Sequence, residues 1–99
     1  VLIPWLGING VTINETVAQR YSIPSVEGVL VVGVVEGSQA DYAGIYAGDV
    51  IIKFNGKSVK MIEELRKNIL SRRAGELVEI SLVRGGKKIY IQTTLGEVP

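Results

Sequence analysis

A single segment of this chain has the spacing of a long amphipathic helix, and glycines divide the rest into short β-rich runs. Apolar residues recur at positions 61, 62, 65, 69 and 70, three and four residues apart, with charged residues between them. This spacing predicts a helix over Met61–Leu70. Its acidic residues come early and Arg72-Arg73 follow its end, as the helix dipole favours, and we expect Gly75 to close it.

The first third of the chain predicts strands separated by one short helix. Leu6–Ile13 combines β-branched residues with two glycines, which indicates a strand that bends. Glu15–Tyr21 contains good helix formers, and Ile23-Pro24-Ser25 is expected to end that helix. Gly28–Val35 is a β-branched run, and we expect a central strand buried on both faces.

Turn signals organise the remainder. Ser38 is a suitable N-cap for a short helix over Gln39–Ala43, with Gly44 as its stop. Two tight turns are expected between strands, at Asn55-Gly56 and at Gly85-Gly86. One strand is expected to lead into the first turn and a short second strand to follow it at 57–59. Two further strands, 76–84 and 87–94, are expected to form a hairpin around the second turn. The sum is an α+β, mostly β fold: a five- to six-stranded, partly open barrel or sandwich capped by one long and one or two short helices.

Composition limits the functions that this chain can carry. With 99 residues and 46% hydrophobic content, one domain over residues 1–99 is expected. Eleven basic and 10 acidic side chains leave a formal charge of +1, so no broad positive field attracts nucleic acid. The chain has no histidine and no cysteine, which excludes a Ser-His-Asp or Cys-His mechanism within it and sulfur-ligated metal sites. We therefore expect no catalysis, no metal and no cofactor.

The ends of the sequence suggest a larger parent. The chain begins at Val1 without an initiating Met, so we expect a fragment of a longer protein. No uninterrupted apolar run approaches the roughly 20 residues of a membrane span.

The order of the sequence blocks points to a family. An Ala-Gly-x-x-x-Gly-Asp-x-Ile pattern runs from Ala43 to Ile51 and is followed by Asn55-Gly56-Lys57. Before it come Gly28-Val29-Leu30-Val31 and Gly37-Ser38-Gln39-Ala40, and after it comes the hairpin of residues 82–87. This order resembles the PDZ domain of HtrA/Deg serine proteases along essentially the whole chain.

The resemblance implies a peptide-binding loop at Trp5-Leu6-Gly7-Ile8. In the family, a loop of this kind binds the C-terminal carboxylate of a partner. The backbone N–H groups of Leu6, Gly7 and Ile8 are expected to converge on the carboxylate, with Gly7 permitting close approach. The strand that follows, which includes Asn9, Gly10 and Val11, is expected to accept an extended peptide as an added strand.

The long helix is expected to form the other wall of this site. Ile62, Arg66 and Ile69 share one face by the i, i+4, i+7 rule, and Leu65 points partly inward. Ile69 would line the pocket for the last side chain of the peptide, together with Leu6 and Ile8, and would favour an apolar residue there. Arg66 would favour acidic or polar groups upstream. Many relatives carry a basic residue before the loop, whereas residues 1–4 are apolar here, so carboxylate binding would rest on amides alone.

These observations lead to an expected function and leave alternatives open. We expect a non-catalytic module that captures C-terminal or hydrophobic ends of unfolded or misfolded proteins for a serine protease domain in the same chain, in protein quality control. The family implies an extracytoplasmic location, in the periplasm or at the cell surface, with a parent that can be membrane-anchored. The alternatives are a PDZ module of another parent, such as an intramembrane metalloprotease or a secretion component, and a structural or oligomerisation domain with an occluded groove. From the residues alone, Ile8, Leu65 and Ile69 are more typical of a core than of a pocket, and Gly7 and Gly10 of turns or bulges. The family resemblance reverses this for Ile8 and Ile69 and gives Gly7 a functional role.

Overall fold

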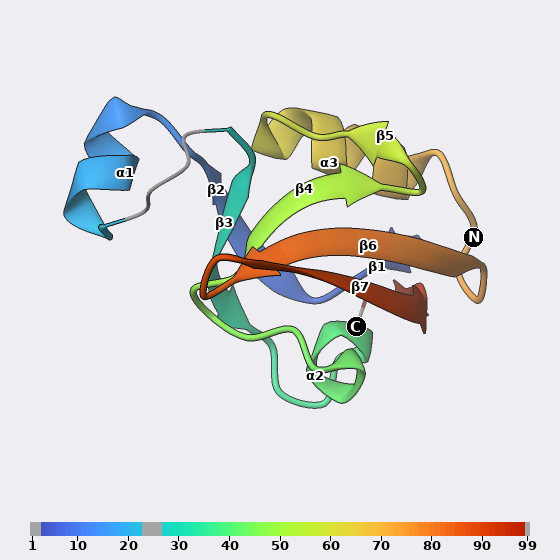
Figure 1. Ribbon diagram of the computed structural model, residues 1–99. Coiled ribbons are helices and arrows are strands. Elements are labelled where there is room, and N and C mark those ends of the chain that lie inside the picture. Colours follow the sequence, from blue (N-terminus) through green and yellow to red (C-terminus); the bar gives the residue numbers. More distant parts are fainter. Residues whose placement is uncertain (1–2, 23–26, 99) are drawn as a thin grey trace.

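The computed structural model describes residues 3–22 and 27–98 of the chain as an open antiparallel sheet with three short helices (Figure 1). Within the described residues the main sheet has six strands in the order β2-β3-β4-β6-β7, with β5 beside β4, and β1 and β8 form a separate pair. The strands are β1 (Pro4–Trp5), β2 (Ile8–Thr12), β3 (Val29–Val34), β4 (Val50–Phe54), β5 (Lys57–Ser58), β6 (Leu77–Arg84), β7 (Lys87–Thr94) and β8 (Gly96–Glu97). The helices are α1 (Glu15–Arg20), α2 (Gln39–Ala43) and α3 (Ile62–Leu70). The expected class, mostly β with a sheet that does not close, is confirmed.

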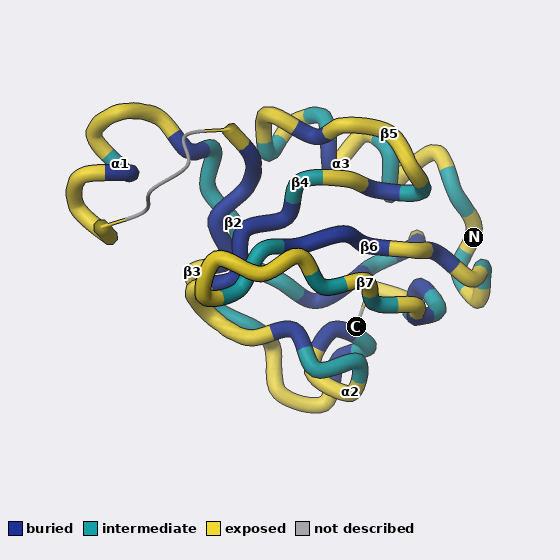
Figure 2. The backbone as a smooth tube through the Cα atoms, viewed as in Figure 1, coloured by how far each residue is buried: buried dark blue, intermediate teal, exposed yellow. Residues whose placement is uncertain are grey.

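The hydrophobic core lies between the sheet and two of the helices. Its largest buried side chains include Phe54 and Ile51 of β4 and Ile80 of β6. Leu65 of α3 and Ala40 of α2 complete it. Figure 2 shows the buried stretches following β4 and β6, while the turns and most of α1 are exposed. This core fixes α3 and the start of the chain relative to each other.

Local signals predicted most of the elements correctly. Asn55 and Gly56 both have positive φ, 50° and 81°, and turn β4 into β5. Ser38 caps α2 by accepting from the Asp41 N–H at 3.2 Å, and Gly44 ends that helix in the left-handed conformation. The Gly85-Gly86 turn joins β6 to β7 in the expected hairpin.

Two expectations about the elements are wrong, and a third concerns residues outside those that the structure describes. β3 is buried only in its first half, because it pairs with β4 only through Val29 and Leu30; beyond them Val32 is 42% exposed. α3 ends at Leu70 with Ser71 as its C-cap, so Gly75 does not close it. The Gly75 N–H donates to the Leu95 carbonyl, just before β6 begins. The stop expected at residues 23–25 lies outside the described residues, and α1 already ends at Arg20.

An ion pair holds the loop that precedes β4. Asp49, 2% exposed, accepts from Arg84 Nε at 2.8 Å and from an Arg84 terminal nitrogen at 2.6 Å, and it also accepts from the Tyr46 N–H. The hydrogen bonds to Asp49 raise the pKa of Arg84 above its ordinary value. Arg84 further donates to the Gly44 carbonyl and lies over the Tyr46 ring at 4.8 Å. The aspartate of the Gly-Asp motif is therefore a structural residue.

Over the described residues, none of the helices is long and apolar enough to cross a membrane.

Candidate functional site

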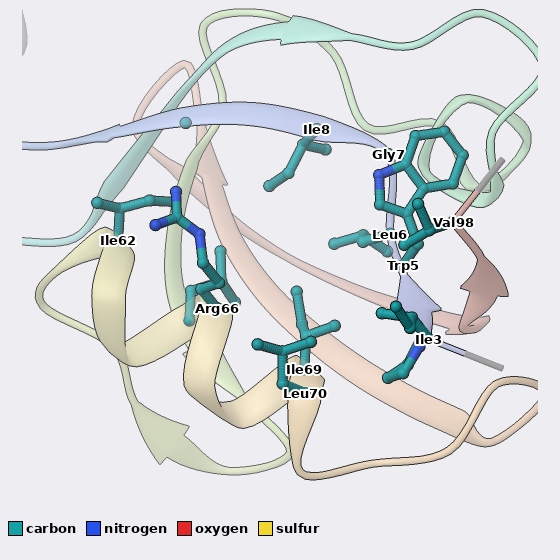
Figure 3. Close-up of a pocket in the computed structure, with 13 residues that line it drawn as sticks. Ile3, Trp5, Leu6, Gly7, Ile8, Ile62, Arg66, Ile69, Leu70 and Val98 are labelled. Atoms are coloured by element: carbon teal, nitrogen blue, oxygen red, sulfur yellow. The ribbon is translucent and has the colours of Figure 1, made fainter. Parts of the chain in front are cut away.

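A cavity of about 290 Å³ opens between β2 and α3 (Figure 3). The loop before β2 closes one end of it, and the β1–β8 pair borders that end. The lining residues are mostly apolar: Ile3, Pro4, Trp5, Leu6, Gly7, Ile8, Gly10, Ile62, Leu65, Arg66, Ile69, Leu70 and Val98. The site thus joins the start of the chain, the long helix and the end of the chain.

Nine of the residues expected at the site lie together in this cavity. They are Trp5, Leu6, Gly7, Ile8, Gly10, Ile62, Leu65, Arg66 and Ile69. Asn9 and Val11 do not line it, because alternate residues of a strand face opposite sides. Val11 packs against the smaller cluster beneath α1, and Asn9 is exposed. Their side chains therefore lie outside the cavity, and their part in binding a peptide through the backbone of β2 stays a prediction.

Four further lining residues were not expected. Leu70 follows Ile69 on α3 and could have been found from helical periodicity. Ile3, Pro4 and Val98 are brought together by the β1–β8 pair, in which Pro4 faces Glu97 and the Val98 N–H donates to the Ile3 carbonyl at 3.0 Å. Strands of two residues have no periodicity, so the sequence carries no signal for this wall.

The loop before β2 is held by its carbonyl groups. The Leu6 carbonyl accepts from the Ala40 N–H of α2 at 3.0 Å. The Gly7 carbonyl accepts from the Val35 N–H at 2.8 Å, and the Ser38 hydroxyl donates to it at 3.4 Å. In a trans peptide the carbonyl and the next N–H point in opposite directions. The N–H groups of Gly7 and Ile8 are therefore directed away from α2 and β3.

Packing within the protein itself requires glycine at position 7. Its φ is +93°, and a Cβ at this position would lie 2.2 Å from the Ser38 Cβ. The sequence interpretation gave Gly7 the role of letting a carboxylate approach. The structure shows that an added side chain would collide with Ser38, beneath the loop.

The outer edge of β2 is unpaired within the described sheet. β2 is the terminal strand, and the Val35-to-Gly7 hydrogen bond makes Ile8 and Val34 a pair that is not hydrogen-bonded. In such a pair the N–H and C=O of each residue point away from the partner strand. Ile8 therefore presents both groups to the cavity side, where another extended chain can bind them.

The helix wall combines apolar and charged side chains. Leu65 is buried in the core and forms the floor, whereas Ile62 and Ile69 are half-buried. Arg66 is exposed, and Figure 3 shows its guanidinium beside Ile62. It takes part in none of the three ion pairs between described residues, and it is the single charged residue of the described cavity lining.

The fold and this site together define a class of protein. The profile of the PDZ domain family matches residues 4–95, and the chain belongs to that family. Its 99 residues contain no histidine and therefore cannot form a Ser-His-Asp triad by themselves.

The curated relatives narrow the branch. The chain is 38% identical over 95 residues to a probable periplasmic serine endoprotease, DegP-like, of Chlamydia trachomatis, covering 96% of this chain and 19% of the relative. It is 34% identical over 90 residues to the periplasmic pH-dependent serine endoprotease DegQ of Escherichia coli, covering 91% of this chain and 20% of the relative. The chain thus spans about a fifth of the length of these relatives. Their names support the extracytoplasmic location expected from the sequence.

Solved structures agree on the fold. The HtrA-type protease AlgW with a decapeptide superimposes with a TM-score of 0.93 at 23% identity, over 100% of this chain and 30% of that chain. The HtrA3 PDZ domain bound to a phage-derived ligand, FGRWV, gives a TM-score of 0.85 at 23% identity, over 96% of this chain and 86% of that chain.

Proposed function

We propose that this domain binds the free C-terminal end of an extended peptide, which adds to β2 as a further antiparallel strand. The observation that carries the proposal is the orientation of the loop carbonyls toward α2 and β3, which leaves the Gly7 and Ile8 amides for a carboxylate. Leu6 supplies the third amide. The described residues that precede the loop, Ile3, Pro4 and Trp5, are apolar, so the amides alone are expected to bind the carboxylate.

The last side chain of the peptide enters the apolar part of the groove. Leu6 and Leu65 form its floor, and Ile8 and Ile69 flank it. Burying a Leu- or Val-sized side chain in such surroundings contributes about 1.5–3 kcal/mol. The ligand bound to the HtrA3 PDZ domain ends in Val, which supports an apolar last residue here.

Arg66 selects among the upstream residues of the ligand. Its guanidinium lies on the groove side of α3 and has no carboxylate partner among the described residues. An acidic ligand side chain facing α3 gains about 0.2–1 kcal/mol from such an exposed pair. Peptides with an acidic or polar residue upstream of the apolar end are therefore preferred.

The domain serves a larger protein. Residues 1–99 form one PDZ domain of an HtrA/Deg-type serine endopeptidase, as the names of the Chlamydia trachomatis and Escherichia coli relatives support. In that setting it presents C-terminal ends of unfolded or misfolded proteins to a protease domain of the same chain. A parent of another kind, or an oligomerisation domain with an occluded groove, is less well supported, because the relatives are endoproteases and Ile8, Ile69 and Arg66 are accessible from the cavity.

A titration of the isotope-labelled domain with a peptide that ends in a free Val or Leu tests the binding mode. The amide protons of Gly7 and Ile8 should move downfield as they donate to the carboxylate, and the amide of Val35, already bonded to Gly7, should move less. Saturable binding that leaves the Gly7 and Ile8 amides unmoved would contradict the proposed site.

A further inference from the structure

Helix α3 lacks a capping side chain at its own N-terminus. The side chain of its N-cap residue, Met61, contains no oxygen and forms no hydrogen bond to the helix. The first helical N–H, that of Ile62, instead donates to the hydroxyl Oγ1 of Thr12 at 2.9 Å. Thr12 lies at the end of β2, 50 residues earlier in the chain. One of the four N–H groups that the start of a helix leaves without an intrahelical partner is therefore satisfied by the opposite wall of the groove.

Ile62 of α3 also packs close to β2 at Gly10. A Cβ at Gly10 of β2 would lie 2.7 Å from Val29 Cγ1 and 3.1 Å from Ile62 Cδ1. Gly10 is absent from the glycines with positive φ, so backbone conformation does not explain it. A side chain at this position would need space that Val29 and Ile62 already occupy. Gly10 and Thr12 are two positions apart and share the groove face of β2.

These contacts lie at one end of the proposed binding groove. A peptide that pairs antiparallel with β2 and places its carboxylate at Gly7 runs with its last residue beside Ile8. Its third residue from the end then lies beside Gly10, and its fifth beside Thr12. The contacts to Ile62 therefore border the upstream part of the ligand rather than its carboxylate.

We propose that Thr12 is a positioning residue that sets the width of the groove by holding the N-terminal end of α3 against β2. The inference rests on the proposed peptide binding and deepens it: the Thr12–Ile62 hydrogen bond keeps the groove narrow where the fourth and fifth ligand residues from the end lie. Peptides that reach this region depend on Thr12. Peptides too short to reach it do not.

The test compares Thr12→Val, which keeps the shape and removes the hydrogen-bond acceptor, with Thr12→Ser, which retains the hydroxyl. Each is titrated with two peptides that share their last three residues, one of three residues and one of six. For Thr12→Val we expect the Kd of the six-residue peptide to rise about fivefold and that of the three-residue peptide to change less than about twofold. Thr12→Ser should bind both as the unmodified protein does.

Other outcomes decide against the inference. An equal rise in Kd for both peptides would show that Thr12 contributes only to general stability. An unchanged Kd for the six-residue peptide would show that Thr12 has no role in peptide binding. If Thr12→Val does not fold, Thr12→Ala answers the question, because it removes the same hydroxyl acceptor and should raise the Kd of the six-residue peptide selectively; an equal rise for both peptides overturns the inference. If the unmodified protein binds neither peptide, the proposed function itself has failed.

Discussion

The backbone N–H of Ala40, at the start of α2, donates to the carbonyl of Leu6 at 3.0 Å. The bond turns the Leu6–Gly7 peptide plane so that the Gly7 amide faces away from α2, and Ser38, next to α2, occupies the space beneath Gly7. Although α2 does not line the groove, it thus determines the orientation of the Gly7 amide in the loop before β2.

Gly7→Ala is expected to destabilise the fold through Ser38. The new Cβ would overlap the Ser38 side chain and the residue would keep a φ of +93°, so the free energy of unfolding should fall by roughly 2–4 kcal/mol. Gly37→Ala is the matched control, because Gly37 has a φ of +79° with nothing within 4 Å of its added Cβ; about 1 kcal/mol is expected. Urea denaturation measures both. Equal losses would show that Ser38 does not constrain Gly7.

Ile69→Ala should weaken the binding of peptides that end in Val or Leu. It removes apolar surface from the wall of the last-residue pocket, and the Kd should rise about tenfold. Leu77→Ala, on an exposed part of β6 outside the cavity, serves as the control and should leave the Kd unchanged. Isothermal titration of both variants with one peptide measures the difference. An Ile69→Ala protein that binds as tightly as the Leu77→Ala protein would place the last side chain elsewhere.

Arg66→Gln should remove the preference for an acidic upstream residue. Two peptides that differ only by Glu or Gln at the third position from the end should differ about two- to fivefold in Kd with Arg66 present and be nearly equal without it. Lys67→Gln makes the same charge change one residue away, outside the cavity lining, and should keep the preference. Added salt should reduce the preference, since exposed pairs are screened. A preference that survives Arg66→Gln assigns the selection to another residue.

Asp49→Asn should lower the thermal stability without changing the groove. The buried carboxylate loses its charge while Arg84 and the Tyr46 N–H remain placed around it, so the Tm should fall by about 5–10 °C. Glu79→Gln, an exposed carboxylate on β6, should shift the Tm little. Circular dichroism melts provide the comparison, and a Tm equal to that of Glu79→Gln would mean that the ion pair is not stabilising.

Elements encoded by neighbouring residues were predictable from the sequence. Asn55-Gly56 and Gly85-Gly86 specify their turns through positive φ, Ser38 and Gly44 bound α2, and the apolar spacing marks α3. In the candidate site, helical periodicity together with the resemblance predicted that Ile62, Arg66 and Ile69 share one face of α3, and all three line the cavity.

Contacts between distant residues were not predictable in this way. Ile3 and Val98 meet through a two-residue strand pair, Ser38 lies beneath Gly7, and Thr12 caps a helix that begins 50 residues later. Each depends on how the elements pack, and no local pattern of residues encodes it.

The most direct test of C-terminal recognition is the affinity for one peptide, ending in Val, synthesised with a free carboxylate and with a C-terminal amide. Binding of the carboxylate to the Gly7 and Ile8 amides predicts that amidation raises the Kd by about tenfold or more, because charge-assisted hydrogen bonds are lost. Equal Kd values for the two forms would contradict it.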